Sequence, residues 1–150
     1  MTALNVVQWT SSGTYTTVIT SGALSGLTTG TGVVSTVSIA NNKNQYAHFE
    51  LQVTATGAFA SGDRFDVYFL VAPDGTNFED GSASVTPARG PDLIIPVRAV
   101  TNTSQRINMK HVPLPQGTFN TLLINQATDP ISTGSSILSY FPYDEQISTV

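Results

Sequence analysis

The side chains that could bind a metal ion or transfer a proton are few and scattered. The sequence contains two histidines, His48 and His111, and no cysteine. Neither histidine lies in the His-x-His or His-Glu-x-x-His spacing that brings two imidazoles onto one metal ion. We therefore interpret both as surface side chains of strands, and we expect neither a metal site nor a cofactor.

One turn gathers several oxygen ligands. Asp74, Asn77, Glu79 and Asp80 lie within a few residues of one another. Calcium ions are bound by such oxygens, but their order here differs from that of an EF-hand loop. Asp, Asn and Gly are also the residues that turns prefer. The pattern favours a turn, with a calcium site as the alternative.

Patterns typical of catalysis are missing from the sequence. No Gly-x-Ser-x-Gly motif occurs, which would present a nucleophilic serine. The carboxylate pairs Asp63/Asp66 and Asp144/Glu145 fall at a strand start and in the C-terminal tail, where we expect solvated charges. Aromatic side chains are 9% of the residues, which favours core or interface packing over a sugar-binding platform. The sequence predicts a protein that is not an enzyme.

The composition limits the partners of this protein. Only 11% of the residues are charged, against about 25% in an ordinary domain. The formal net charge is −4 and the six Lys and Arg residues are scattered, so we predict no binding of nucleic acid. No apolar run reaches the length of a membrane span, and the N-terminus lacks the pattern of a signal peptide. The absence of cysteine agrees with synthesis in a reducing cytoplasm.

The clearest prediction from the sequence is a strand over residues 62–72. Phe65, Val67, Phe69 and Val71 alternate with the other side chains at the period of two that strands show. The outer positions begin polar and become apolar at Tyr68 and Leu70, as in a central strand. Pro73-Asp74-Gly75 then predicts a turn, followed by a short outer strand over residues 76–79.

Further strands follow at near-even spacing along the chain. We predict them over residues 4–9, 14–20, 33–39, 45–55, 92–100, 104–112, 119–125 and 136–141. Residues 21–32 are predicted as a loop pinned by Leu24 and Leu27, and no segment shows a helical period. The chain is thus predicted to be all-β, a jelly-roll-like β-sandwich of about 8–10 short antiparallel strands. We expect a single domain over residues 1–150, with residues 1–20 as a candidate N-terminal arm.

The order of features from about Ser25 onward resembles a family of small β-rich virion proteins of tailed bacteriophages. The matching pieces are Leu27-Thr-Thr-Gly30, Ser38-Ile-Ala-Asn41, Tyr46, Asp66-Val-Tyr-Phe-Leu70, Asp74-Gly-Thr-Asn-Phe78, Asp80-Gly81, Val97-Arg-Ala99, Leu114-Pro-Gln-Gly-Thr-Phe119, Leu122-Leu-Ile-Asn125 and Leu138-Ser-Tyr-Phe-Pro-Tyr143. The likeness covers roughly the last four-fifths of the chain, and most of its motifs are turn and strand patterns.

The resemblance implies a non-enzymatic structural protein of the virion. Several proteins of this kind are capsid decoration, or cement, proteins that bind the outside of the head and stabilise it, often as homotrimers. The implied partners are the major capsid protein and further copies of this chain, and the implied location is the capsid exterior after synthesis in the bacterial cytoplasm. A tail or adaptor component is the alternative within the same class, and a carbohydrate-binding attachment module is the alternative from another class.

Three aromatic residues are candidates for the interface. Trp9 and Tyr15 lie in the expected arm, and Tyr143 lies in the C-terminal tail. Large aromatic anchors at interfaces carry much of the binding energy, and alanine truncation of one costs about 2 kcal/mol or more. The alternative that Trp9 is a core residue stays open.

Overall fold

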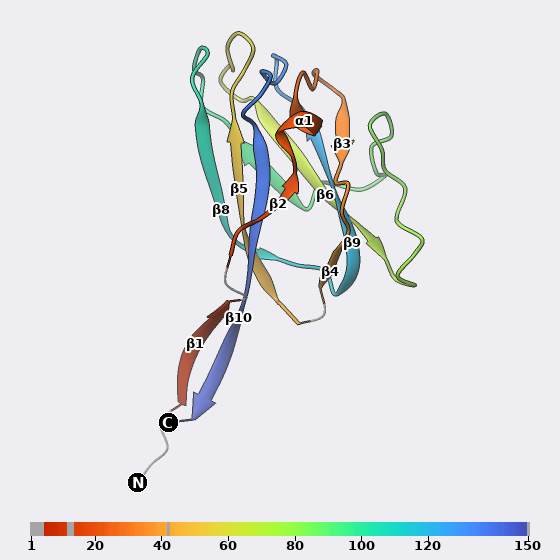
Figure 1. The fold of residues 1–150 in the computed structure, drawn as a ribbon, viewed down its shortest axis with the longest axis vertical. Helices are drawn as coiled ribbons and strands as arrows, with labels where there is room; N and C mark the ends of the chain where they lie inside the picture. The colour runs from red at the N-terminus through yellow and green to blue at the C-terminus, as the bar shows by residue number, and fades with distance from the viewer. Residues whose placement is uncertain (1–4, 12–13, 42, 150) are drawn as a thin grey trace.

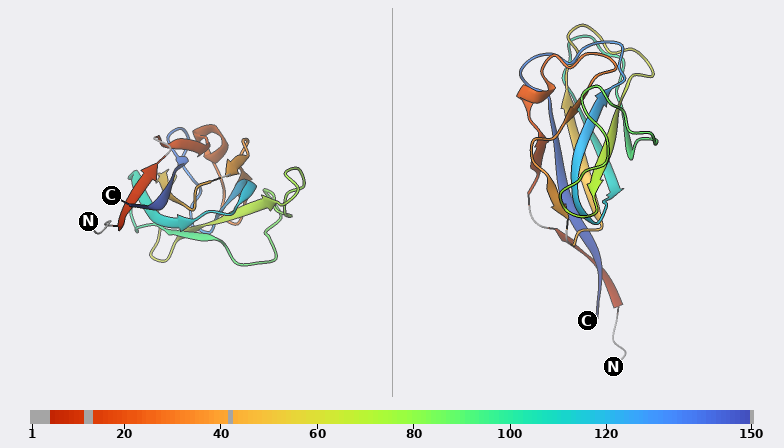
Figure 2. Two further views of the ribbon diagram at one scale, coloured as in Figure 1. Left: turned by 90° about the horizontal axis from the view of Figure 1, so that it is seen from below. Right: turned by 90° about the vertical axis from the view of Figure 1, so that its right-hand side faces the viewer.

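The protein is a sandwich of two antiparallel sheets, which confirms the predicted fold class. The computed structural model describes the backbone of residues 5–11, 14–41 and 43–149, and the side chains of residues 14–41 and 43–145. Figure 1 shows the two sheets packed face to face, and the view from below in Figure 2 shows them as two layers. Among the described residues, no helix has the length and apolar character needed to cross a membrane.

Each sheet is built from five strands. Sheet A contains β1 (Asn5–Ser11), β2 (Thr16–Ile19), β5 (Tyr46–Val53), β8 (Gln105–Pro113) and β10 (Ile137–Thr149). Sheet B contains β3 (Gly32–Val34), β4 (Ile39–Asn41), β6 (Arg64–Ala72), β7 (Leu93–Pro96) and β9 (Gly117–Asn125). The one-turn helix α1 (Ser21–Leu24) lies between β2 and β3.

The chain crosses repeatedly from one sheet to the other. Sheet A has the order β2-β10-β5-β8, and sheet B has the order β3-β9-β6-β7, with β4 pairing β9 beyond β3. Strands that are distant in the sequence are therefore neighbours in space, and every pairing is antiparallel. This is the strand order of a jelly roll.

The core lies between the sheets, and the alternation of the sequence explains it. In β5, Ala47, Phe49, Leu51 and Val53 are buried while the residues between them are half-buried. They pack against the inward side chains of β6, where Phe49 lies 5.4 Å from Phe69 between ring centroids. The predicted inward sets of residues 45–55 and 62–72 are confirmed.

The predicted loop over residues 21–32 is pinned as expected, but Ser21–Leu24 form the one-turn helix α1 and β3 begins at Gly32. The Leu24 side chain is fully buried, and Leu27 packs against the core. Asn125 at the end of β9 donates its side-chain amide to the Leu27 carbonyl at 2.9 Å, which ties the loop to sheet B.

Residues 33–39, predicted as one strand, form two. Both β3 and β4 pair with β9, but the ladder is interrupted between them at Ser35. The Ser35 backbone N–H donates to the Thr121 carbonyl at 2.8 Å, and the Ser35 hydroxyl accepts the Thr121 N–H at 3.0 Å. A side-chain oxygen thus takes the place of a backbone carbonyl, and the regular strand stops there.

Three further expectations are corrected. Residues 76–79 form no strand, because Asp74 accepts the backbone N–H groups of Thr76 and Asn77 and folds them into a turn. The last strand does not end at residue 141 but continues to Thr149, paired with β1. The carboxylates of Asp63 and Asp66 are buried rather than solvated, at 6% and 5% exposure.

The end of β10 leaves the sandwich together with β1. Residues 144–149 of β10 pair with β1 in a register that runs from Thr10↔Asp144 to Asn5↔Thr149. We call this two-stranded segment the ribbon. Figure 1 and the right-hand view of Figure 2 show it projecting from one end of the sandwich. Residues 16–19 of the expected arm belong to the sandwich, where Val18 and Ile19 join the core.

Candidate interaction surface

The outer face of sheet B is covered by the chain itself. Tyr68, Leu70, Leu122 and Ile124 form a second apolar cluster on that face, and Phe78 from the long β6–β7 loop packs against it. The loop backbone approaches so closely that a Cβ on Gly81 would lie 2.8 Å from a methyl carbon of Leu70. The outer positions of residues 62–72 become apolar because this loop covers them.

An arginine holds the loop in place. Arg89 donates to both Glu79 carboxylate oxygens at 2.7 and 2.8 Å, to Asp92 at 2.7 Å, and to the Phe69 carbonyl at 2.9 Å. The Phe69 N–H donates to Asp92 at 2.6 Å. We call these three charged residues the Arg89 clamp. Its side chains form hydrogen bonds with the Phe69 N–H and carbonyl, which lie on the part of the β6 edge beyond the end of β7.

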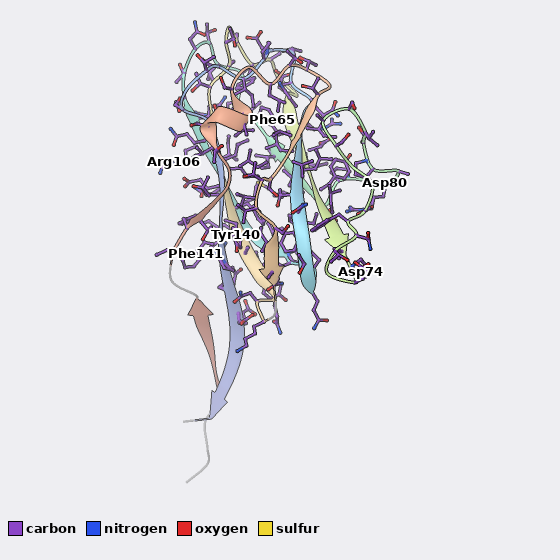
Figure 3. The ribbon with its side chains drawn as sticks, turned by 45° about the vertical axis from the view of Figure 1, so that its right-hand side comes forward. Phe65, Asp74, Asp80, Arg106, Tyr140 and Phe141 are labelled. Atoms are coloured by element: carbon purple, nitrogen blue, oxygen red, sulfur yellow. The ribbon has the colours of Figure 1, made fainter. Side chains whose placement is uncertain are left out.

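The clamp and the turn hold the candidate calcium ligands in separate interactions. Glu79 is paired with Arg89, whereas Asp74 accepts hydrogen bonds from Asn77 and Thr76, which hold the pKa of the Asp74 carboxyl well below its usual range. Figure 3 shows Asp74 and Asp80 at separate points of this loop. Among the described residues, no group of three acidic or histidine side chains is arranged to hold a metal ion. The hydrogen bonds that Asp74 accepts from Thr76 and Asn77 confirm the predicted turn.

The buried carboxylates Asp63 and Asp66 have structural partners. Asp63 accepts the Ala60 N–H at 2.8 Å and the Thr128 hydroxyl at 2.9 Å. Asp66 pairs with Arg64 at 3.1 Å. Both carboxylates thus hold the start of β6 and its neighbouring loop.

The outer face of sheet A carries a group of rings instead of a covering loop. We call it the aromatic band, and it consists of Tyr15, Tyr46, His48, His111, Phe141 and Tyr143. It crosses β5, β8 and β10, and it extends to the residue before β2. Phe141, labelled in Figure 3, lies on β10 above the start of the ribbon. The rings meet because the register places Phe141 opposite His48, and Tyr143 opposite Tyr46.

The two histidines, 63 residues apart, are brought together by the pairing of β5 with β8. His111 lies where the register shifts between Ala47 and Phe49, and its backbone has a left-handed φ of 57°. This bulge lets the His111 N–H donate to Nδ1 of His48 at 3.3 Å. The spacing of the histidines along the sequence gives no sign of this contact.

The His111 ring packs into the band from its edge. It stacks on Tyr46 with centroids 3.9 Å apart, and its Nδ1 lies 2.8 Å from the Tyr143 hydroxyl. Glu145 lies 3.8 Å from the same nitrogen. His111 thus connects the outer edge of sheet A to the residues from which the ribbon emerges.

The surroundings of His48 favour its neutral form. Burial, followed by the charge of Lys110 and the proximity of His111, lowers the pKa of His48 below its ordinary value of 6.5. A proton on Nδ1 would also place two donors against each other at the His111 N–H.

The structure places the three predicted interface residues at different depths. Tyr15 is 51% exposed, and its ring lies 5.3 Å from that of Phe141. Tyr143 is 1% exposed, because Tyr46, His48 and His111 pack over it. Trp9 lies in β1, opposite Glu145 in the register, and its side chain is outside the described residues. The band therefore joins Tyr15 and Tyr143, while Trp9 belongs to the ribbon.

The chain matches no family model, no curated protein and no solved structure among those compared. The resemblance to virion proteins of tailed bacteriophages therefore rests on the sequence motifs alone.

A shallow groove of about 560 Å³ lies between the two sheets near the Arg89 clamp, lined by Phe69, Val71 and Leu114 among others. Its charged groups are already ion-paired with one another. On the aromatic band, Tyr15 and His111 are about half exposed. The sequence predicts Tyr15 and Tyr143 as interface residues, and His48 and His111 as surface side chains of strands. It does not predict that these rings meet one another and Phe141, because their contacts depend on cross-strand pairing.

Proposed function

We propose that this protein is a non-enzymatic structural component of a tailed-phage virion that binds the outside of the head and stabilises it. The observation that carries the proposal is the contrast between the two outer faces. The face of sheet B is covered by the chain's own loop, whereas the face of sheet A presents the aromatic band and leads directly into the ribbon. The resemblance of the sequence motifs to virion proteins of tailed bacteriophages is the reason for proposing a phage particle.

In this proposal the partner is the major capsid protein, with further copies of this chain as a homotrimer. The protein is made in the bacterial cytoplasm and acts on the capsid exterior. A domain with few charges and an uncovered aromatic surface suits repeated protein contacts, and symmetric copies on one lattice multiply weak contacts into strong attachment. A tail or adaptor component would use the same surface on a different partner.

The test is to mix the purified protein with undecorated expanded heads of the phage whose genome encodes it, to pellet the heads and to image them by electron microscopy. We expect regular density on the shell and heads that withstand higher temperature. No binding to heads, together with recovery of the protein in tails, would move the proposal to the tail.

The Trp9→Ala variant distinguishes an interface residue from a core residue. We expect it to lose at least tenfold in affinity for heads, since a hot-spot truncation costs about 2 kcal/mol or more. The melting temperature of the free protein should stay unchanged. A large drop in melting temperature would instead make Trp9 a core residue.

A second candidate function has one observation in its favour. Tyr15 and His111 expose half of their side chains on the aromatic band, and sugars stack on exposed rings. A carbohydrate-binding attachment module would use this platform. Binding to a glycan array, lost in Tyr15→Ala, would support it over the head protein.

A further inference from the structure

The outer strand of sheet A, β8, has a long unpaired edge. It is the end strand in the order of sheet A, and Figure 1 shows it at the margin of the sandwich. It has nine residues, whereas β2 and β7, at other margins of the sandwich, have four each. Among the described residues, no backbone hydrogen bond from outside sheet A reaches residues 105–112. Such an edge presents N–H and C=O groups to which another extended chain can bind.

The chain itself occupies the two ends of this edge. At the start, the Gln105 side chain accepts the Arg98 N–H at 2.8 Å and donates to the Arg98 carbonyl at 3.0 Å. Toward the other end, the bulge turns the His111 N–H to His48, and Pro113 has no N–H to donate. The part left for a partner is residues 106–110, which we call the open edge.

The open edge separates two unlike faces of β8. Arg106 and Lys110 are exposed on the outer face, where Arg106 pairs with Glu50 at 3.5 Å and still exposes 62% of its side chain. Ile107 and Met109 lie on the inner face, where they pack against the core but are only half-buried. A strand placed along the open edge would have cations beside one face and apolar side chains beside the other.

A groove continues the inner face of the open edge. Met109 is opposite Phe49 in the register, and the Phe49 ring lies 5.4 Å from that of Phe69. Phe69 and Val71 line the groove of about 560 Å³ between the sheets, together with Pro113 at the end of β8. The inner side chains of an added strand would therefore lie against apolar surface.

We propose that the open edge of β8 binds an extended acidic segment of a partner protein, which adds to sheet A as a further strand. Carboxylates and apolar residues alternate in this segment. The carboxylates lie opposite Arg106 and Lys110, and the apolar side chains cover Ile107 and Met109. The inference goes beyond the proposed function, because it assigns a surface other than the exposed rings of the aromatic band and applies to any particle whose proteins supply such a segment.

The charges of β8 favour an acidic segment. The whole chain has ten Asp and Glu residues against six Lys and Arg residues. The strand β8 nevertheless contains two cations and no carboxylate, and Glu50 on the neighbouring strand pairs with only one of the two. Opposite charges that face each other across neighbouring strands attract, and like charges repel. A carboxylate-bearing strand therefore fits this edge better than a neutral or basic one.

A second copy of β8 is a poor occupant of the open edge. Two copies that paired antiparallel about Asn108 would set Arg106 of one opposite Lys110 of the other, where like charges repel. Lysine on an edge strand is a common means of preventing such pairing between copies. The same cations that disfavour a second copy select an acidic strand.

The test uses a synthetic peptide, Ser-Glu-Val-Thr-Val-Glu-Ser, whose carboxylates have the spacing of Arg106 and Lys110 and whose valines lie on the opposite face. The control peptide, Ser-Glu-Glu-Thr-Val-Val-Ser, has the same composition without the alternation. Each peptide is titrated to millimolar concentration into the isotope-labelled full chain, and the amide resonances are followed by NMR. We expect the alternating peptide to shift the amides of residues 106–110, and the control peptide to leave them unchanged.

Two lysine variants separate the open edge from general attraction of anions. Lys110→Glu reverses a charge on the open edge, whereas Lys43→Glu makes the same change at an exposed position between β4 and β5. We expect Lys110→Glu to bind the alternating peptide about fivefold more weakly or worse, because a cross-strand attraction becomes a repulsion. Lys43→Glu should bind it as the wild type does. Circular dichroism should show the same fold in all three proteins.

Three results would overturn the proposal. Equal binding of the two peptides, or equal binding by the two variants, would mean that the protein attracts anions without forming a strand. Resonance shifts confined to the aromatic band would place the peptide on that surface instead. No binding of the alternating peptide at millimolar concentration would mean that the open edge does not accept an acidic strand.

Discussion

Replacing Arg89 with alanine tests whether the long β6–β7 loop is held by one side chain. Arg89 donates to the Phe69 carbonyl and to the carboxylates of Glu79 and Asp92, and it lies over the Tyr68 ring at 5.8 Å. The Arg89→Ala variant removes all of these contacts at once. It leaves a β6 carbonyl without its donor and two carboxylates side by side.

The expected loss follows from these contacts. A hydrogen bond from a charged donor contributes about 1.5–3 kcal/mol, and the lower end applies because 35% of the Arg89 side chain is exposed. The two ion pairs add at most about 1 kcal/mol each and are screened by water. We therefore expect the free energy of unfolding to fall by about 2–3 kcal/mol.

The assay is urea unfolding followed by circular dichroism, with Arg98→Ala as the control. Arg98 is exposed and its side chain forms no ion pair among the described residues, so that change should cost less than about 0.5 kcal/mol. Arg89→Lys should recover part of the loss, because lysine keeps the charge but lacks the planar fork of donors. Hydrogen exchange should become faster in residues 69–72.

Equal effects of Arg89→Ala and Arg98→Ala would refute this reasoning. The loop would then be held by the packing of Phe78 and Gly81 on the apolar cluster, and the clamp would contribute nothing measurable.

Three further predictions concern the core, the loop contact and the histidines. Phe49→Ala should lower the free energy of unfolding in urea by about 3–5 kcal/mol, because the ring is fully buried and leaves a cavity. Gly81→Val should lower the free energy of unfolding by about 1–3 kcal/mol in the same assay, because a Cβ at this position would lie 2.8 Å from a methyl carbon of Leu70. An unchanged free energy of unfolding would mean that the loop moves freely. His48 has a lower pKa folded than unfolded, so the unfolded chain binds the extra proton first and stability should fall as the pH drops below about 6.5. Melting curves between pH 7.5 and pH 5 should show a smaller decrease in His48→Gln, and equal decreases would remove His48 as the cause.

The strands of the sandwich could be predicted because their side chains alternate. In residues 62–72 the inward set is Phe65, Val67, Phe69 and Val71, and the structure confirms it. The apolar outer positions Tyr68 and Leu70 are visible in the sequence and predict a central strand. What covers them could not be predicted, because the covering loop has no periodicity and is held by Arg89.

The ribbon could not be predicted from local pattern. Residues 144–146 are Asp-Glu-Gln, which have low strand preference, and they form a strand because β1 pairs with them from the other end of the chain. The contact between His48 and His111 is hidden for the same reason. The sequence predicts the two strands, but the contact depends on their register and on the bulge, which the sequence does not show.

The ribbon also decides how the molecule responds to mechanical load. Asn5 and Thr149 are opposite each other at the tip, so a force that pulls these two ends apart opens the cross-strand pairs one after another. A force that draws the tip away from the sandwich instead runs along β10, which is continuous from the tip into the centre of sheet A. That direction shears the paired strands together, and it transmits tension directly into the jelly roll. A load applied at the tip of the ribbon is therefore carried by β10 into the centre of sheet A.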